Sequence, residues 1–399
     1  MKICIAGKNN IAVEILLYLL NMGVDKKEIL IISNKTDNGE DSWQRSLRKL
    51  ASIYHINEVI LKDLYHIEEL IFLSLEFDRI INPALFKTNR LFNIHFSLLP
   101  KYKGMFTSII PILNNEKYTG VTLHKIDSGI DTGEIIAQSK FEILYNDNSR
   151  DIYINYIKYG IELIKKNIKN ILKDNFSSNK QNYLESSYFS KQSIDFSKIH
   201  IDLNQTAINI HNQVRAFNFR EYQVPKIFNT EIISSTILYN RSDLKPGVIL
   251  FETDIYYCIS TIDNNIILYK DKSNELFEAC HKGDIDKVIK LIQIPKIINI
   301  QNEKGWTPLI VAIYHNNKNI IKILLANGAD LSINNFNGTT PMMYAKNAYS
   351  TFKDRETIEL LKKFNLNLYQ NDFYNKNIFD YCIKNNELEV MDIIKEKSK

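Results

Sequence analysis

The last third of the chain contains a pattern that returns every 33 residues. The segment GWTPL at residues 305–309 returns as GTTPM at 338–342, and alanines stand at 279, 312 and 345 with the same spacing. A Thr-Pro pair begins a helix, because threonine caps the helix and proline fits its first turn. One such unit cannot bury its own apolar face, so several must stack. The pattern therefore predicts an all-α module over residues 273–399.

The period and the Thr-Pro-Leu signature of this module resemble the ankyrin repeat. We count a partial first repeat over 274–304, two good repeats over 305–337 and 338–372, and a degenerate cap over 373–399. Trp306 stands at the exposed turn position, where the next repeat has Thr339. A large ring there indicates a contact surface. Its uses stay open: packing against the neighbouring strands, binding a protein partner, or forming a second small-ligand site.

The first 200 residues alternate between strand-like and helix-like patterns. Strands are expected at Lys2–Ala6, Glu28–Ser33, Glu58–Leu61, Leu91–Phe96, Gly120–Ile126 and Glu134–Leu144, and helices at Asn10–Met22, Ser42–Tyr54 and 154–171. The segment Glu69–Leu75 followed by Arg79–Ile81 is interpreted as a helix leading into a strand. The alternation favours an α/β fold, a Rossmann-like domain with a mainly parallel sheet. We expect this domain to span residues 1–200.

Residues 201–272 form a small strand-rich middle region in this interpretation. A helix is expected over Asp202–Phe217, opened by a capping box between Asp202 and Gln205. Short antiparallel strands are expected at Ile232–Leu238, Gly247–Thr253, Ile255–Ile262 and Ile266–Tyr269. Exposed strand edges pair readily with a second copy, so this region is where we predict a homodimer contact.

Composition excludes several classes of protein. The net charge is only +4 on 399 residues, which is too small for a protein whose main function is to bind nucleic acid. The apolar run Ile15–Leu20 is too short to cross a membrane, and the first residues show no signal-peptide pattern. The four cysteines are scattered without a CxxC pair, which favours the reducing cytoplasm and argues against a structural zinc site.

Two stretches of the α/β half carry chemistry. Asn93 and His95 lie two residues apart on a predicted strand, so their side chains share a face near the strand end, before a Pro-containing loop. Asp131 lies in a loop between two later strands, with glycines at 129 and 133. An imidazole can take a proton from an attacking amine, an amide can donate to an oxyanion, and a carboxylate can orient the imidazole. Each residue also has an ordinary structural interpretation.

The motifs around these residues resemble the folate-dependent formyltransferases. The pattern N-x-H-x-S-x-L-P with K-x-x-G spans 93–104, G-V-T-x-H spans 120–124, and D-x-G spans 131–133. The resemblance implies formyl transfer from N10-formyltetrahydrofolate to an amine, without a metal, by the catalytic residues Asn93, His95 and Asp131. It also implies that Ser74, Leu75 and Glu76 lie in the folate-binding loop. The turn after the first strand is GKNN rather than GxGxxG, so a nicotinamide cofactor is not supported.

Three further segments resemble the bacterial nucleotide-sugar N-formyltransferases within that family. The resemblance implies a dTDP-amino-dideoxyhexose acceptor, with arginine or lysine on the diphosphate and aromatic rings on the base. The implied nucleotide-sugar-binding residues are Lys8, Asn9, Lys101, Gly104, Met105, Phe106, Thr107, Arg215, Phe217, Arg220 and Tyr222. Phe217 is equally well explained as a core residue. The family's tRNA branch carries a basic C-terminal domain, which nothing in this sequence matches.

The leading hypothesis is a cytoplasmic sugar N-formyltransferase that modifies a dTDP-3-amino-3,6-dideoxyhexose for O-antigen, and thus lipopolysaccharide, synthesis. One alternative is dTDP-4-amino-4,6-dideoxyglucose as the acceptor. An alternative of another class is an ankyrin interaction scaffold whose formyltransferase domain has decayed. The presence of Asn93, His95 and Asp131 favours the enzyme.

Overall fold

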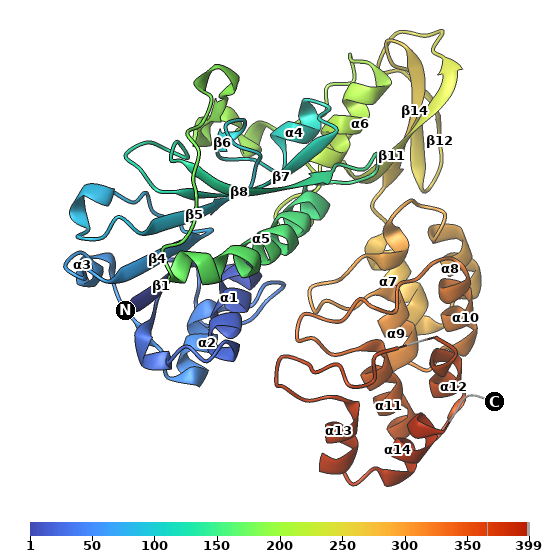
Figure 1. Ribbon diagram of the computed structural model, residues 1–399. Helices are drawn as coiled ribbons and strands as arrows, with labels where there is room; N and C mark the ends of the chain where they lie inside the picture. The colour runs from blue at the N-terminus through green and yellow to red at the C-terminus, as the bar shows by residue number, and fades with distance from the viewer. Residues whose placement is uncertain (365, 397–399) are drawn as a thin grey trace. The chain divides into compact units, whose positions relative to one another are not determined.

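The computed structural model describes residues 1–364 and 366–396, and the chain divides into two compact units, Met1–Asn229 and Thr230–Lys399 (Figure 1). This division differs from the predicted boundaries at residues 200 and 272. Helix α6 (Ala207–Ala216) joins the core of the first unit through Ala216. The strands after residue 230 share a core with the helical repeats through Ile233.

The first unit is built on a seven-stranded sheet in the order β3-β2-β1-β4-β5-β7-β8. The strands are β1 (Lys2–Gly7), β2 (Ile29–Ser33), β3 (Asn57–Glu58), β4 (Leu70–Leu75), β5 (Leu91–His95), β7 (Tyr118–Lys125) and β8 (Ile135–Glu142). The five strands from β3 to β5 in this order pair in parallel. Strand β7 pairs antiparallel with both of its neighbours, β5 and β8. The predicted Rossmann-like, mainly parallel α/β fold is confirmed.

Helices and two short strands complete this unit. The helices are α1 (Asn9–Asn21), α2 (Leu47–Tyr54), α3 (Leu61–Leu64), α4 (Ile110–Leu113), α5 (Ser149–Leu172) and α6. The predicted amphipathic helix is α5, and its apolar side buries Ile157, Ile164 and Ile171. Helices α1 and α5 lie side by side against the sheet (Figure 1). Strand β6 (Lys103–Gly104) pairs in parallel with β9 (Tyr188–Phe189), away from the main sheet.

The segment Glu69–Leu75 was predicted as a helix, and that prediction is wrong. Residues Leu70–Leu75 form β4, which is buried along its whole length between β1 and β5. A strand covered on both faces shows no alternation, so a short apolar run does not distinguish it from a buried helix. The following residues Arg79–Ile81 form no strand.

Three helix or strand limits also differ from the predictions. Helix α2 begins at Leu47 rather than Ser42, because the Ser46 side chain caps it by accepting from Lys49 N at 2.9 Å. Helix α6 begins at Ala207, capped by Thr206, so the predicted capping box of Asp202 is wrong. Strand β3 ends at Glu58, before the predicted limit at Leu61.

The second unit joins an antiparallel sheet to paired helices. Strands β11 (Thr230–Arg241), β14 (Asn264–Lys270), β13 (Tyr256–Ile259) and β12 (Ile249–Glu252) pair in that order. Among the described residues of this unit, the helices form four successive pairs: α7 (Ser273–Lys282) and α8 (Ile285–Leu291), α9 (Pro308–Tyr314) and α10 (Lys318–Ala326), α11 (Pro341–Phe352) and α12 (Glu356–Lys362), α13 (Ile378–Lys384) and α14 (Leu388–Lys395).

The Thr-Pro pairs begin helices as predicted. Thr307 accepts from Ile310 N at 3.2 Å at the start of α9, and Thr340 accepts from Met343 N at 3.3 Å at the start of α11. The first repeat, which looked partial in sequence, is a complete helix pair. The end of the predicted cap, residues 397–399, lies outside the described residues. Across the described ranges, no helix combines the length and apolar content that spanning a membrane requires.

Two glycines of the repeats allow a matched test of their packing. Gly305 and Gly328 both have left-handed backbone, with φ of +76° and +90°. A Cβ at Gly305 would lie 2.4 Å from Phe336 N, whereas Gly328 faces open space. Alanine costs roughly 1 kcal/mol at either site through its backbone alone, and Gly305→Ala adds a steric clash.

We therefore expect Gly305→Ala to lower the melting temperature more than Gly328→Ala does. Differential scanning calorimetry of the full chain measures both variants. Equal losses would contradict the close approach of residues 305 and 336.

Candidate active site

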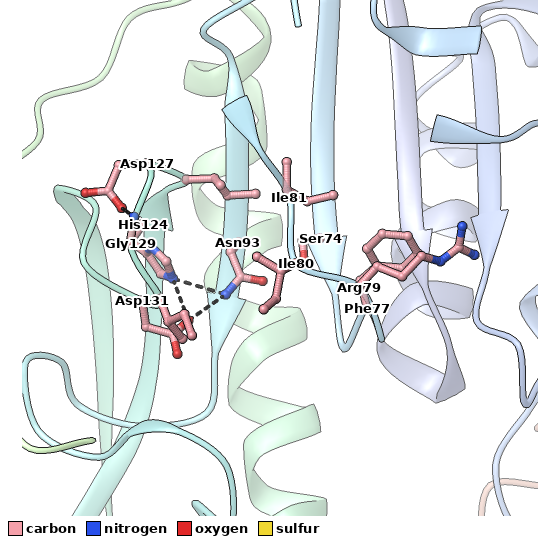
Figure 2. A pocket seen from close by; sticks show the side chains of 12 residues that line it. Ser74, Phe77, Arg79, Ile80, Ile81, Asn93, His124, Asp127, Gly129 and Asp131 are labelled. Atoms are coloured by element: carbon pink, nitrogen blue, oxygen red, sulfur yellow. Dashed lines mark hydrogen bonds and ion pairs between the residues drawn. The ribbon is translucent and has the colours of Figure 1, made fainter. Parts of the chain in front are cut away.

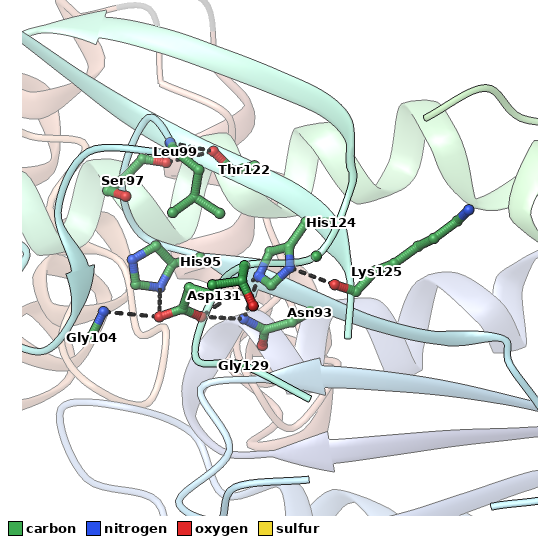
Figure 3. Close-up of polar contacts among 12 residues, drawn as sticks. Asn93, His95, Ser97, Leu99, Gly104, Thr122, His124, Lys125, Gly129 and Asp131 are labelled. Atoms are coloured by element: carbon green, nitrogen blue, oxygen red, sulfur yellow. Dashed lines mark hydrogen bonds and ion pairs between the residues drawn. The ribbon is translucent and has the colours of Figure 1, made fainter. Parts of the chain in front are cut away.

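The site forms where β5 ends and the sheet turns from parallel to antiparallel. Asn93 and His95 share a face of β5, as predicted. In the register with β7, Asn93 stands opposite His124 and His95 opposite Thr122. Asp131 lies in the loop between β7 and β8, with a left-handed φ of +54°. Figure 3 shows these side chains converging from the two strands and the loop.

His95 is buried between a carboxylate and a backbone carbonyl. Its Nε2 lies 2.8 Å from Tyr102 O, and its Nδ1 lies 3.4 Å from Asp131 Oδ2. A carbonyl oxygen only accepts, so Nε2 carries a hydrogen and donates it to Tyr102. The lone pair of the neutral ring is then on Nδ1, on the side of Asp131.

His124 was not predicted as a site residue, yet it fixes the Asn93 amide. His124 Nδ1 lies 2.7 Å from Lys125 O and therefore donates to it, which leaves Nε2 as an acceptor. Asn93 Nδ2 lies 3.0 Å from His124 Nε2 and 3.5 Å from Asp131 Oδ1. The sequence did hold a signal, because His124 ends the G-V-T-x-H motif. Its position opposite Asn93 appears only in the strand pairing.

The charges of the site are set by burial and by these contacts. Burial raises the pKa of Asp131, but His95, His124 and the Gly104 N–H together lower it to about 2. Gly104 N donates to Asp131 Oδ2 at 2.9 Å. Burial lowers the pKa of His95, and Asp131 partly opposes that effect. At neutral pH the site therefore holds an ionised carboxylate beside a neutral imidazole.

A cavity of about 150 Å³ opens beside Asn93 and Asp131 (Figure 2). Apolar and polar side chains line it in nearly equal numbers. The lining residues are Ser74, Phe77, Arg79, Ile80, Ile81, Asn93, His124, Ile126, Asp127, Gly129, Ile130 and Asp131. A concave site in which polar groups converge beside apolar side chains is typical of a small-molecule site.

The predicted folate loop is placed only in part at this cavity. Ser74 lines it, whereas Leu75 is 1% exposed and belongs to the core. The Glu76 carboxylate instead accepts from Tyr153 Oη at 2.8 Å and from Asn9 Nδ2 at 3.2 Å. Burial raises the pKa of Glu76. Residues after Glu76, among them Arg79, Ile80 and Ile81, line the cavity. They were not predicted as binding residues, because Arg79–Ile81 was interpreted as a strand.

The predicted nucleotide-sugar residues fall into two groups. Asn9 and Tyr222 meet at an aromatic cluster, defined as Trp43, Tyr153, Phe219 and Tyr222, whose ring centroids lie 4.8–6.0 Å apart. Tyr222 is 62% exposed and so is open to a ligand. Trp43 and Tyr153 gave no such signal in the sequence, because they lie far from Tyr222 along the chain.

The other predicted contacts have their own places in the structure. Lys8 and Arg220 are half-buried, and Lys101 is exposed. Gly104 holds Asp131, Met105 is exposed, and Phe106 packs on Phe196 at 5.6 Å, while Thr107 O accepts from Tyr156 Oη at 2.8 Å.

Arg215 is placed differently from its prediction as a diphosphate ligand. Arg215 is 8% exposed, and its guanidinium donates to Asn212 Oδ1, Leu144 O and Asp147 O at 3.0–3.2 Å. These bonds tie α6 to the loop before α5, so they argue against a diphosphate contact. Phe217 packs on the core of the first unit, in line with its alternative interpretation.

Trp306 is half-buried within the repeats. Its ring lies 5.0 Å from Tyr314 and 5.0 Å from Tyr344, both in the repeats. Lys304 Nζ lies 5.7 Å above it. Within the described residues, no group of three or more His, Cys, Asp or Glu side chains could hold a metal ion, and all four cysteines are buried and free.

Comparisons with known proteins agree on the family. A formyl transferase model matches residues 57–166, and an ankyrin-repeat model matches 276–353. The structure of WlaRD, a sugar 3N-formyl transferase, was solved with dTDP and 5-N-formyl-THF. It is 51% identical, covers 68% of this chain and 97% of its own, and has a TM-score of 0.64.

An N-formyltransferase from Helicobacter canadensis, in complex with folinic acid and dTDP-3-aminofucose, is 49% identical. It covers 68% of this chain and all of its own, also with a TM-score of 0.64. Among curated proteins, the bifunctional polymyxin resistance protein ArnA of Wigglesworthia glossinidia brevipalpis is 28% identical over 91% of this chain. The chain spans about half of that relative's length, 54%.

The arrangement of His95 leads to a prediction about its titration. We expect its imidazole to titrate below pH 6.5, because burial outweighs the opposing effect of Asp131. In Asp131→Asn the pKa should fall further, since the carboxylate that raises it is gone. Long-range ¹H–¹⁵N NMR follows the ring, with His95→Asn to assign its signal. A pKa above 6.5, or no change in Asp131→Asn, would contradict this electrostatic arrangement.

Proposed function

This chain belongs to the formyltransferase family that includes the sugar N-formyltransferases, and we propose that it transfers a formyl group from N10-formyltetrahydrofolate to a dTDP-3-amino-3,6-dideoxyhexose. The observation that carries the proposal is the contact of the half-buried Asp131 with the buried His95 and the half-buried Asn93 beside a cavity. The two relatives near 50% identity support the choice of ligands, because they were crystallised with dTDP or a dTDP-3-amino sugar and a formylated folate.

His95 serves as the general base in this proposal. Its Nδ1 lone pair is available, since Nε2–H is held by Tyr102 O. Nδ1 takes the proton that the acceptor amine loses as the new C–N bond forms, and then returns a proton to the leaving nitrogen. Asp131 stabilises the charged imidazolium between these two transfers, because it lies 3.4 Å from Nδ1 and stays ionised.

Asn93 serves as the amide donor to the oxygen that gains negative charge. Of its two contacts through Nδ2, the one to His124 is short at 3.0 Å and the one to Asp131 is long at 3.5 Å. The longer bond is the weaker one, so it is the one exchanged for the formyl oxygen. His124 keeps the amide nitrogen directed into the site during that exchange.

The cavity is the proposed place of one end of the folate donor, since its volume of about 150 Å³ holds a part of such a molecule. When bound, N10-formyltetrahydrofolate supplies the formyl group. Phe77, Ile80, Ile81 and Ile130 would cover the faces of a flat ring, while Ser74, Arg79 and Asp127 would meet its polar edge. The cavity ends at Asn93 and Asp131, so a donor seated there lies next to the catalytic residues.

The aromatic cluster is the proposed place of the nucleotide base. Tyr222 offers an exposed ring beside Trp43, and Asn9 offers an amide at the same place. Lys8, Lys101 and Arg220 remain the proposed contacts to the diphosphate. The formylated sugar would enter O-antigen synthesis in this proposal. A panel of dTDP-3-amino and dTDP-4-amino sugars tests the acceptor, and a preference for the 4-amino sugar would favour the alternative substrate.

The scaffold alternative requires a formyltransferase domain that has lost its chemistry. The intact contacts of Asn93, His95 and Asp131 speak against that loss. We also propose a homodimer through the edge strand β12, where Ile249 and Phe251 are 40% and 49% exposed. Sedimentation equilibrium measures this association, and a monomer at micromolar concentration would overturn it.

Replacement of the proposed base should separate turnover from binding. We expect His95→Asn to lower kcat by ~10² or more, the usual contribution of a general base. Affinity for the dTDP-sugar should stay within about twofold, because a base acts mainly in the transition state. Steady-state kinetics and calorimetry measure the two quantities.

His55→Asn is the matched control. His55 is exposed and has left-handed backbone, which asparagine tolerates. Turnover in His95→Asn equal to that of the control would remove His95 from the mechanism.

Trp306 remains the proposed centre of a second small-ligand site. Its ring packs with Tyr314 and Tyr344, and its half-exposed face could stack on a nucleotide base. Calorimetry with the dTDP-sugar should find two sites per chain in the wild type and one in Trp306→Ala, with kcat unchanged. A single site in both proteins would overturn the proposal and leave a protein partner as the use of the repeats.

A further inference from the structure

The segment Gln181–Phe189 reaches back from the end of α5 to both loops that carry the site. It contains the short strand β9. Its contacts fall on two places, the loop 100–105 after β5 and the loop 131–133 after β7.

The first set of contacts holds the loop 100–105. Tyr102 N donates to Ser187 Oγ at 2.8 Å, and Lys103 N donates to Ser187 O at 2.9 Å. Met105 N donates to Phe189 O at 2.8 Å, and the rings of Tyr102 and Phe189 stack at 5.8 Å. Ser187 therefore binds two successive residues of the loop through its side chain and its backbone.

The backbone approaches so closely at this point that only glycine fits. A Cβ at Gly104 would lie 2.2 Å from Phe189 O, and Gly104 has a left-handed φ of +85°. The contact between β6 and β9 therefore requires the glycine at position 104. This requirement indicates that the loop 100–105 has a fixed position against β9.

Both reacting side chains are bound to the backbone that this contact fixes. Tyr102 O accepts from His95 Nε2, and Gly104 N donates to Asp131 Oδ2. Tyr102 and Gly104 are two residues apart in one loop. The position of that loop therefore sets where the imidazole and the carboxylate stand relative to each other.

The second set of contacts holds Asp131 from its own backbone. Gln181 is 6% exposed, and its Nε2 donates to Asp131 O at 2.9 Å and to Gly133 O at 2.7 Å. Asp131 has left-handed backbone, which is unfavourable for a residue other than glycine unless its surroundings hold it. Gln181 supplies two bonds to the turn that contains it.

We infer that Gln181 and Ser187 are positioning residues, and that the segment Gln181–Phe189 clamps both loops so that His95 Nδ1 stands 3.4 Å from Asp131 Oδ2. This inference rests on the proposed function for its kinetic consequence. The clamp acts through the backbone of the two loops, so the alignment of the base depends on it directly, whereas the proposed diphosphate contact Lys101 in the same loop uses an exposed side chain. Misalignment of reacting groups lowers kcat far more than it changes KM.

The clamp also has a consequence for titration. The titratable groups that act on His95 are Asp131, His124 and Lys103, together with the carbonyl of Tyr102. Asp131 and the Tyr102 carbonyl raise the pKa of His95 against the effect of burial. A looser clamp weakens both contacts, so the pKa of His95 should fall and the acid limb of the kcat profile should move to lower pH.

The test compares variants of two adjacent serines. Ser187→Ala removes the hydroxyl that accepts from Tyr102 N, whereas Ser186→Ala removes an exposed hydroxyl one residue away. We expect Ser187→Ala to lower kcat roughly tenfold or more, with both KM values within about threefold, and to move the acid limb to lower pH. Ser186→Ala should match the wild type. Ser187→Thr keeps the hydroxyl and should restore kcat to within about twofold of the wild type.

Gln181→Met supplies the second variant, because it keeps the side-chain length and removes both donors. It should show the same split between kcat and KM as Ser187→Ala, and circular dichroism verifies that each variant is folded. Equal kcat in Ser187→Ala and Ser186→Ala would overturn the inference, as would a loss that appears in KM alone.

NMR titration of His95 in the free protein separates this inference from the proposed function. A lower pKa of His95 in Ser187→Ala than in Ser186→Ala supports the clamp even if the wild type formylates no sugar in the panel. An unchanged pKa in Ser187→Ala and Gln181→Met overturns it even if the wild type is active.

Discussion

The antiparallel pairing of β5 with β7 is the constraint on which the site depends. Strands β3 to β5 run in parallel, so their carboxyl ends meet at one edge of the sheet. Strand β7 enters in the opposite direction and brings His124 opposite Asn93. The end of β5 lies beside the middle of β7, whereas the loop after β7 begins beside the start of β5 and brings Asp131 back to within 3.4 Å of His95.

Burial and nearby charges have opposite effects on the pKa values of Asp131 and His95. As a result, the carboxyl of Asp131 is ionised while the neighbouring imidazole of His95 is neutral. Burial alone favours a neutral carboxyl and a neutral imidazole. The N–H of Gly104 and the two histidines outweigh burial for Asp131, which stays ionised. For His95 burial prevails, so its lone pair is retained near neutral pH. The two groups differ because Gly104 and Asn93 donate hydrogen bonds to the Asp131 carboxylate, whereas burial has the largest effect on His95.

Several charged side chains that look functional in a sequence serve the structure instead. Arg215 stands in a run of aromatic and basic residues, but its guanidinium binds backbone carbonyls of the loop before α5. Glu76 belongs to the predicted folate loop, yet Tyr153 and Asn9 hold its carboxylate beside the aromatic cluster. In both cases the nearest partners come from distant parts of the chain, where spacing along the sequence carries no information.

The sequence by itself determined the repeat module, the α/β class and the three candidate catalytic residues that the fold brings together. The repeat period of 33 residues and the two-residue spacing of Asn93 and His95 are patterns within short segments of the sequence. Such patterns can be interpreted directly, because they follow from the geometry of helices and strands. It did not determine that Leu70–Leu75 is a strand, because a fully buried strand lacks alternation. Only the tertiary structure decided that His124 orients Asn93 and that Gln181 and Ser187 hold the two loops. Those contacts join residues separated by 31 to 85 positions, and which distant segments meet is set by sheet pairing and close packing rather than by any pattern within one segment.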